Sequence, residues 1–324
     1  MADGKWITDL AADVPLVEAA RHVLAVRLRV VGEALPRAVH EADRDPEHVH
    51  QLRVATRRAD AALRIFAGCL PRKAYKGARK RLRRIRRAAG AARDWDVFLI
   101  ALRERAAGQP AKEQAGLDLL TGYALGQRAA AQAQLEAVGQ EQGPRFEGFV
   151  ARTLEAIRPP PEGECAATLI EHARPLLSGL LFNLEQAAAG NLDDYAQLHQ
   201  VRIAGKRLRY AMEVFAPCFD GSFREQLYPL VEEMQEILGR ANDSHVAEAR
   251  LTALRDRLRR SAPREWKRYQ PAVAGLLRFH QRRLPQERRR FLQWWGDWRK
   301  SGAEALLALT PSGAAPARRA ALRG

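Results

Sequence analysis

The apolar residues of this 324-residue chain recur three or four positions apart along nearly its whole length. That spacing gathers them on one face of an α-helix, and the β-branched runs typical of strands are scarce. We therefore predict an all-α protein. The first set of predicted helices covers residues 14–43, 46–68, 72–90, 94–107, 111–138 and 144–157. A second set covers residues 165–190, 195–216, 222–239, 243–260, 265–284 and 286–308.

Two segments of the chain have nearly the same sequence. VHQLRVATRRADAALRIF begins at Val49, and LHQVRIAGKRLRYAMEVF begins at Leu198, 149 residues later. The same offset relates Gly90 to Gly239 and the phrase RDWDV to NDSHV. An ungapped match over some fifty residues indicates an internal duplication. It predicts two pseudo-symmetric helical bundles.

The duplication and the proline content together suggest domain boundaries. The stretch RPPPEGE at 158–164 disfavours helix and is interpreted as a linker. Residues 1–157 then form the first half and residues 165–310 the second, and 311–324, which have no core-forming pattern, are predicted to be a flexible tail.

Aspartates occupy matching positions before the repeated helices. Asp45 and Asp194 precede the repeated phrase, where a carboxylate can cap a helix N-terminus. Asp94 and Asp243 stand where the next predicted helices begin, and we interpret them as N-caps that can also form an ion pair with a neighbouring arginine.

On a helical wheel the repeated phrase separates into a cationic stripe and an apolar face. His50, Arg53, Arg57 and Arg64 share one side, extending about 21 Å along the axis. The second copy places His199, Arg202, Lys206 and Arg209 on the corresponding side. Like charges at this spacing repel one another, so a stripe kept twice favours an anionic ligand. Arginine meets phosphate oxygens with two parallel donors, and histidine adds a further donor.

The helix after the first copy strengthens the cationic character. Between Arg72 and Arg87, ten of sixteen residues are lysine or arginine. The residues predicted to point outward or to flank the buried seam, and therefore to contact a polyanion, are Arg79, Lys80, Arg83, Arg86 and Arg87. A merely solvated basic face is the alternative interpretation of this segment.

The overall charge agrees with a polyanionic partner. The chain has 54 lysines and arginines against 38 aspartates and glutamates, a formal net charge of +16. Such a surface favours nucleic acid, anionic lipid or polyphosphate. The N-terminus lacks the pattern of a signal peptide, and no apolar stretch is long enough to span a bilayer. Cys69, Cys165 and Cys218 form no CxxC pair, so we expect a cytoplasmic protein without a disulfide.

The doubled phrase, each copy followed by a helix that ends in a G..(R/N)D..V pattern, resembles the CHAD domain, the conserved histidine α-helical domain. The resemblance covers residues 10–310 and, without room for an N-terminal CYTH domain, is that of a stand-alone member. It implies two pseudo-symmetric four-helix bundles packed around a basic central groove or pore. It also implies binding of inorganic polyphosphate and, in some members, association with polyphosphate granules. The residues it matches, including two that lie off the cationic stripe, are His50, Arg53, Arg57, Arg58, Arg64, His199, Arg202, Lys206, Arg207 and Arg209. Asp60 and Glu213 depart from the expected basic pattern.

Other functions fit the residues less well. His48 and His50 could bind a metal only with further ligands, and the stripes offer almost no carboxylates, so we predict no metal, no cofactor and no enzymatic activity. Membrane binding is disfavoured because the bundles need the apolar faces. Nucleic acid is the main alternative partner. The stripes, however, lack the stacking aromatics of single-strand binders and the base-reading amides of duplex readers. The sequence does not determine the oligomeric state.

Overall fold

The computed structural model describes residues 5–106, 110–159 and 167–302, and these residues are almost entirely helical. Within them the one extended pairing is an isolated bridge between Pro15 and Thr168. The all-α prediction is confirmed. Most of the proposed linker and the whole proposed tail lie outside the described residues, so those boundaries stay predictions.

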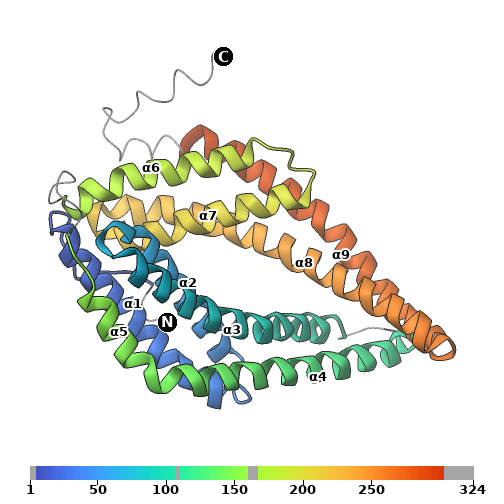
Figure 1. Cartoon of the computed structure of the whole chain (residues 1–324). Helices are drawn as coiled ribbons and strands as arrows, with labels where there is room; N and C mark the ends of the chain where they lie inside the picture. Colours follow the sequence, from blue (N-terminus) through green and yellow to red (C-terminus); the bar gives the residue numbers. More distant parts are fainter. Residues whose placement is uncertain (1–4, 107–109, 160–166, 303–324) are drawn as a thin grey trace.

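The helices follow one another in two similar series (Figure 1). The first consists of α1 (Leu16–His40), α2 (Glu47–Ile65), α3 (Arg72–Ala106), α4 (Ala111–Gln142) and α5 (Phe146–Glu155). The second consists of α6 (Leu169–Ala188), α7 (Tyr195–Phe215), α8 (Tyr228–Ser261) and α9 (Pro263–Asp297). A 3-10 turn follows α2 at Ala67–Cys69, and another follows α7 at Ala216–Cys218, again 149 residues apart. The repeated order agrees with a duplication, although pseudo-symmetry of the two halves remains an interpretation of the sequence.

Two of the four predicted aspartate caps are confirmed. The Asp45 carboxylate accepts a hydrogen bond from the Glu47 backbone N–H at 2.7 Å. Asp194 is the N-cap of α7 and accepts one from the Ala196 N–H at 2.9 Å. Asp94 and Asp243, by contrast, lie inside α3 and α8, so their assignment as caps is wrong.

Helices that we expected to be separate are continuous. Residues 72–90 and 94–107 join in α3, residues 222–239 and 243–260 join around α8, and α9 continues through Pro285. A glycine inside a helix costs only about 1 kcal/mol. An interior proline costs more, about 3 kcal/mol. Packing offsets these costs, because α8 and α9 contact each other extensively and α9 also contacts α4.

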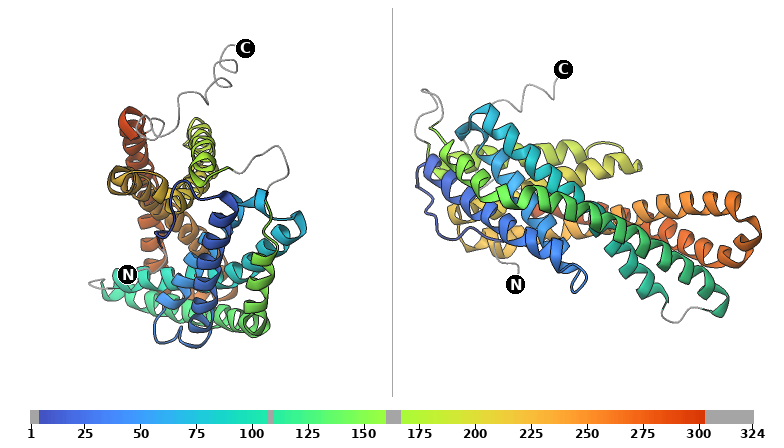
Figure 2. Two further views of the ribbon diagram at one scale, coloured as in Figure 1. Left: turned by 90° about the vertical axis from the view of Figure 1, so that its left-hand side faces the viewer. Right: turned by 60° about the horizontal axis from the view of Figure 1, so that its bottom comes forward.

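The continuous helices create a second hydrophobic core. The main core fills the body of the protein with residues from α1, α2, α6 and α7 and from the nearer parts of α3, α4 and α8. The second core joins the far parts of α3 and α4 to those of α8 and α9, through residues such as Leu102, Leu120, Leu251 and Leu276. The far parts of α3 and α4 form one long hairpin and those of α8 and α9 form another, and both extend from the body in the same direction (Figures 1 and 2). The halves therefore share a core in addition to touching along α2 and α7.

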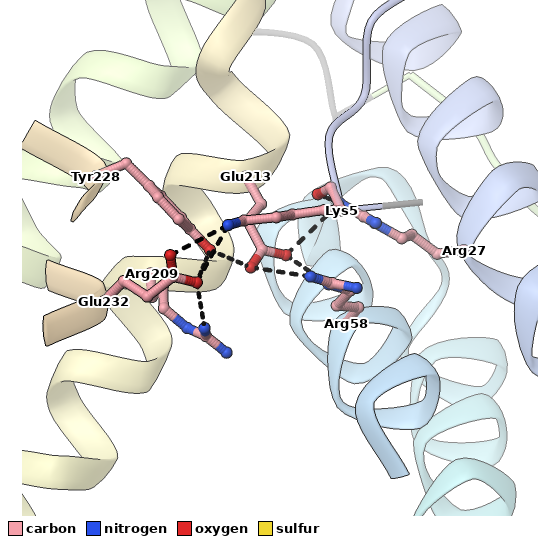
Figure 3. A network of polar contacts seen from close by, with 7 residues as sticks. All are labelled: Lys5, Arg27, Arg58, Arg209, Glu213, Tyr228 and Glu232. Carbon is pink, nitrogen blue, oxygen red and sulfur yellow. Dashed lines mark hydrogen bonds and ion pairs between the residues drawn. The ribbon is translucent and has the colours of Figure 1, made fainter. Parts of the chain in front are cut away.

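A buried ionic network also joins the two halves (Figure 3). Glu213 of α7 is completely buried and accepts a hydrogen bond from Arg58 Nε of α2 at 2.6 Å. The Tyr228 hydroxyl donates to the same carboxylate at 2.8 Å, and Arg27 of α1 lies 4.0 Å from it. Removing one partner of such a network leaves an uncompensated buried charge, so the network fixes the position of α7 against α1 and α2.

Candidate functional site

Both halves contribute to a cavity of about 620 Å³ that opens beside α2 and α7. Its walls come from α2, α3, α7, α8 and α9 and contain ten arginine or lysine side chains against four carboxylates. The cavity brings together eight of the residues predicted from the sequence. They are Arg53, Arg57, Arg64, Arg86, His199, Arg202, Lys206 and Arg207.

Cations of the two repeated helices lie near one another in the cavity lining. Arg53 lies 3.6 Å from the Asp94 carboxylate. Burial and the neighbouring charge of Arg57 lower the pKa of Arg53 to about 10. Arg202, from the other half, has a pKa lowered by burial and again by Arg57, and its Nε is buried without a hydrogen-bond partner in the described chain. These cations are thus brought close together without enough carboxylates to neutralise them.

Lys206 has the most strongly lowered pKa of these cations. Burial, followed by the charges of Arg57 and Arg202, lowers the pKa of its amine from 10.5 to about 5. No carboxylate that the structure describes lies within ion-pair distance of Lys206. A desolvated amine among arginines holds its proton only weakly. The amine is therefore neutral at pH 7, and an anion placed beside it would restore its charge.

Gly90 makes room for one of the central arginines. A Cβ added there would lie 2.5 Å from Arg53 Nη1, so the absence of a side chain lets the guanidinium lie against α3. Gly239, at the equivalent position in α8, has nothing within 4 Å of an added Cβ. The repeated glycine therefore has a structural role beside Arg53 and none of that kind in the second half.

The two repeated histidines differ in position. His199 lines the cavity, and burial and the charge of Arg202 lower its pKa. His50 lies outside the cavity lining, and burial and Arg93 lower its pKa. Neutral rings are expected at pH 7 in both cases, because their ordinary pKa is already 6.5.

Asp60 orients three arginines at one end of the cavity. Its carboxylate accepts hydrogen bonds from Arg64 at 2.9 Å, Arg79 at 2.8 Å and Arg86 at 3.2 Å. Burial alone would raise the pKa of Asp60, but the hydrogen bond from Arg79 and the three positive charges lower it below 3.8. One carboxylate neutralises only one of these arginines, so the group keeps a positive charge while its side chains are held in place.

Glu287 of α9 plays the same part at another wall, which the sequence analysis did not identify. It is 2 % exposed and pairs with Arg240 at 3.1 Å, Arg290 at 3.0 Å and Arg283 at 3.7 Å. Arg240 and Arg283 line the cavity, as do Arg250, His280 and Asn242. The arginine-rich run at 278–290 was the available signal, but nothing in it indicates which arginines turn toward α2 and α7.

Arg250 shows how α8 reaches across to α3. Its guanidinium donates to the Asp94 backbone carbonyl at 2.8 Å and lies 4.3 Å from the ring centre of Trp95. Burial lowers its pKa, and the Asp94 carboxylate acts in the opposite direction. This contact holds the α8 wall of the cavity against the first half of the chain.

The other predicted residues lie away from the cavity. Arg58 belongs to the buried Glu213 network, and Arg209 pairs with Glu232 at 3.3 Å (Figure 3). Arg79 reaches the cavity only indirectly, through Asp60. The residues that lie exposed on α3 outside the cavity lining are Lys80, Arg83 and Arg87.

Three further features bear on the kind of site. Among the described residues, histidine, cysteine, aspartate and glutamate nowhere gather in a group of three or more suited to a metal ion. None of the helices in that part of the chain combines the length and the apolar character needed to cross a membrane. Cys69 and Cys218 are free thiols.

Comparison with known proteins finds both a family and similar folds. The family model described as "CHAD domain" matches residues 22–252. The crystal structure of the CHAD domain from the plant Ricinus communis superposes with a TM-score of 0.69 at 25 % identity, covering 92 % of this chain and 94 % of that one. PptA from Streptomyces chartreusis superposes with a TM-score of 0.68 at 20 % identity, covering 87 % and 99 %. A search of curated proteins finds no match.

Proposed function

Because this chain belongs to the CHAD-domain family, which is associated with polyphosphate, we propose that it binds inorganic polyphosphate in the cavity beside α2 and α7. The observation that carries the proposal is the convergence of Arg53, Arg57, Arg202 and Lys206, two from each half, on one cavity. A chain of phosphates supplies negative charges at regular intervals, and so matches a cationic surface that the protein builds from two helices at once.

Phosphate oxygens complement what the cavity lacks. The Arg202 Nε is a buried donor without a partner in the described chain, and the Lys206 amine is surrounded by arginines. A phosphate beside them accepts the hydrogen bonds and neutralises the repulsion among the guanidinium groups. The surplus positive charge of the walls therefore contributes to ligand binding, and it does not stabilise the folded protein in the absence of the ligand.

Exposed cations extend the site along α3. Arg86 lines the cavity. On the same helix Arg87 is the next residue, Arg83 lies one turn before Arg86, and Lys80 lies a further turn before that. A polymer that leaves the cavity on this side remains close to these side chains, which accounts for the cationic density of the α3 segment.

The arrangement favours binding over catalysis. The carboxylates at the cavity include Asp60 and Asp94, which hold arginines, so they are poorly placed to act as general bases. We propose that the protein retains polyphosphate without cleaving it, and that the bound polymer attaches it to polyphosphate granules.

Nucleic acid is the competing ligand, and the lining of the cavity favours phosphate without bases. Tyr210 lines the cavity but is 6 % exposed, so it offers no open face for stacking. Phe98 is likewise 6 % exposed and belongs to the second core. Single-strand binders use accessible rings of this kind as platforms.

The test is a binding titration of the protein and of the double variant Arg57→Gln/Arg202→Gln against long-chain polyphosphate. We expect the variant to lose at least tenfold in affinity, because each arginine contributes a charge-assisted contact. The matched control is Arg264→Gln/Arg268→Gln, which removes the same charge from exposed positions of α9 outside the cavity lining.

Two results would contradict the proposal. One is equal affinity of the parent and of the cavity variant, with both folded by circular dichroism. The other is a preference for single-stranded or duplex DNA over polyphosphate in a competition titration at physiological salt, which would assign the cavity to nucleic acid. Salt dependence alone does not separate the two polymers, because both release counterions.

A further inference from the structure

A second hollow, of about 580 Å³, lies between the end of α3, the start of α4 and the middle of α9. Its walls include Arg105 of α3, Glu113 of α4 and, on α9, Arg278, Arg282 and Arg290. It lies outside the residues that the sequence singled out as binding positions.

The second hollow adjoins the cavity. Arg283 lines both spaces. Its guanidinium is oriented by Glu287 at 3.7 Å, and the same carboxylate holds Arg240 of the cavity wall and Arg290 of the hollow. The wall between the two spaces is therefore a cluster of three arginines around one buried carboxylate, and any anionic chain that passes it meets positive charge on both sides.

Helices α4 and α9 cross at short distance beside the hollow. A Cβ added at Gly116 of α4 would lie 2.6 Å from the Ala272 Cβ of α9. One turn further along α9, an added Cβ at Gly275 would lie 3.3 Å from the Glu113 carboxylate. The hollow begins at Gly275, which belongs to its lining, so the contact of α4 with α9 fixes where the space starts.

Phe279 fixes two arginines in the hollow. The guanidinium carbons of Arg105 and Arg283 each lie 5.7 Å from the centre of its ring. Cation–π contacts of this kind stabilise the orientation of an arginine side chain, and for Arg283 they add to its ion pair with Glu287. Arg105 has a buried Nε without a hydrogen-bond partner among the described residues.

The charges of the hollow are unbalanced in the same way as those of the cavity. Arg278 and Arg282 are exposed and pair with no carboxylate that the structure describes. Glu113 and Glu287 are the acids of the lining, and Glu287 is already shared among three arginines. The lining therefore keeps donors free for an anion.

We propose that this second hollow is a distal subsite for the phosphate chain, in which the polymer leaves the cavity past Arg283 and lies along α9 between Arg278 and Arg290. That stretch of helix is about 18 Å long. The proposal rests on the proposed function and adds chain-length selectivity to it. A short chain fills the cavity alone, whereas a long chain also occupies the distal subsite and binds more tightly.

The experiment compares tripolyphosphate and long-chain polyphosphate as ligands of the full chain and of Arg278→Glu/Arg282→Glu. Both arginines are exposed and lie outside the cavity lining, so the fold and the cavity are preserved. We expect the affinity for the long chain to fall at least tenfold and that for tripolyphosphate to change less than twofold. The slope of log K against log salt for the long chain should become shallower by about 1.4, because each phosphate of a flexible strand that the protein neutralises adds about 0.7 to it.

The matched control is Arg264→Glu/Arg268→Glu. It reverses the same charges at the same spacing on the same helix, outside the lining of the hollow. Unchanged long-chain affinity in Arg278→Glu/Arg282→Glu would overturn the distal subsite, as would an equal loss in the control or for tripolyphosphate. Failure of the unaltered protein to bind either polyphosphate would instead refute the proposed function.

Discussion

Replacing Lys206 by methionine should stabilise the protein and at the same time weaken its binding of polyphosphate. The amine of Lys206 is buried among arginines of both halves, and its pKa falls from 10.5 to about 5. Methionine has a similar length without the charge, so it fits the space and removes the cost of desolvating an amine. The same substitution removes a group that a bound phosphate would hold in its charged form.

The size of the effect follows from the difference in pKa between the folded and unfolded states. The folded value is the lower one, so Lys206 reduces stability below about pH 10.5. The reduction grows as the pH falls to about 5 and stays at its maximum below that. At pH 7 the distance to 10.5 is 3.5 units, which at 1.36 kcal/mol per unit gives about 5 kcal/mol as an upper bound. We expect Lys206→Met to raise the free energy of unfolding by about 1 to 4 kcal/mol, the range found when buried ionic groups give way to apolar ones.

The assay is urea unfolding of the parent and of Lys206→Met at pH 7 and at pH 10.5. The stability difference should shrink to under about 1 kcal/mol at the higher pH, because the lysine of the unfolded chain then loses its proton as well. Lys267→Met, an exposed position on α9, serves as the control and should change stability by less than about 0.5 kcal/mol. Lower stability of Lys206→Met at pH 7, or a difference independent of pH, would refute the reasoning.

Binding supplies a second readout of the same group. Calorimetric titration with polyphosphate at pH 7.5, repeated in buffers of different ionisation enthalpy, should show uptake of about one proton per bound chain, since phosphate restores the charge of Lys206. Lys206→Met should bind more weakly and lose this uptake. An unchanged uptake would assign the proton to another group.

Three further substitutions, one of them with a matched control, test other parts of the structure. Gly90→Ala should weaken polyphosphate binding by displacing Arg53, while adding up to about 1 kcal/mol of helix stability. Its control, Gly239→Ala, should change only the stability. Equal affinities of the two variants for polyphosphate would disprove that Gly90 makes room for Arg53. Glu213→Gln should lower the free energy of unfolding in urea by about 3 to 5 kcal/mol. A loss under about 1 kcal/mol would show that the negative charge of Glu213 does not stabilise the buried network. Asp60 has a lowered pKa, so its contribution to stability is present above about pH 4 and is lost as the pH falls through the folded value. Asp60→Asn should be less stable than the parent at pH 7, and the difference should shrink as the pH falls below about 4; a pH-independent difference would contradict this.

Much of the architecture could be predicted from the chain alone, because it depends on local periodicity. Helical spacing predicted the elements, and the 149-residue repeat predicted their order in both halves. The caps at Asp45 and Asp194 were correctly identified, since a helix N-terminus needs an acceptor close in sequence. The same rule failed at Asp94 and Asp243, where tertiary packing carries the helices onward and the carboxylates turn toward the cavity instead.

The candidate site was predictable as far as it depends on one helix at a time. The wheel identified Arg53, Arg57, Arg202 and Lys206 because their side chains share a face of their own helix. It placed Arg58 off the stripe, and the family resemblance still counted this arginine among the binding residues. Only contact with α7 reveals that Glu213 holds it in the interior. Whether an arginine of the repeated helices lines the cavity or is buried in an ion pair therefore depends on the residues that face it from other helices.

The sequence by itself determined an all-α chain with a repeated cationic helix, since periodicity and charge are properties of neighbours along the chain. Only the tertiary structure decided which cations face one another, which are neutralised by Asp60, Glu213 or Glu287, and that α8 and α9 complete the cavity. The physical reason is that burial and charge pairing depend on distance in space. Burial and then the charge of Arg57, which belongs to the other half of the chain, lower the pKa of Lys206, and no local pattern encodes that contact.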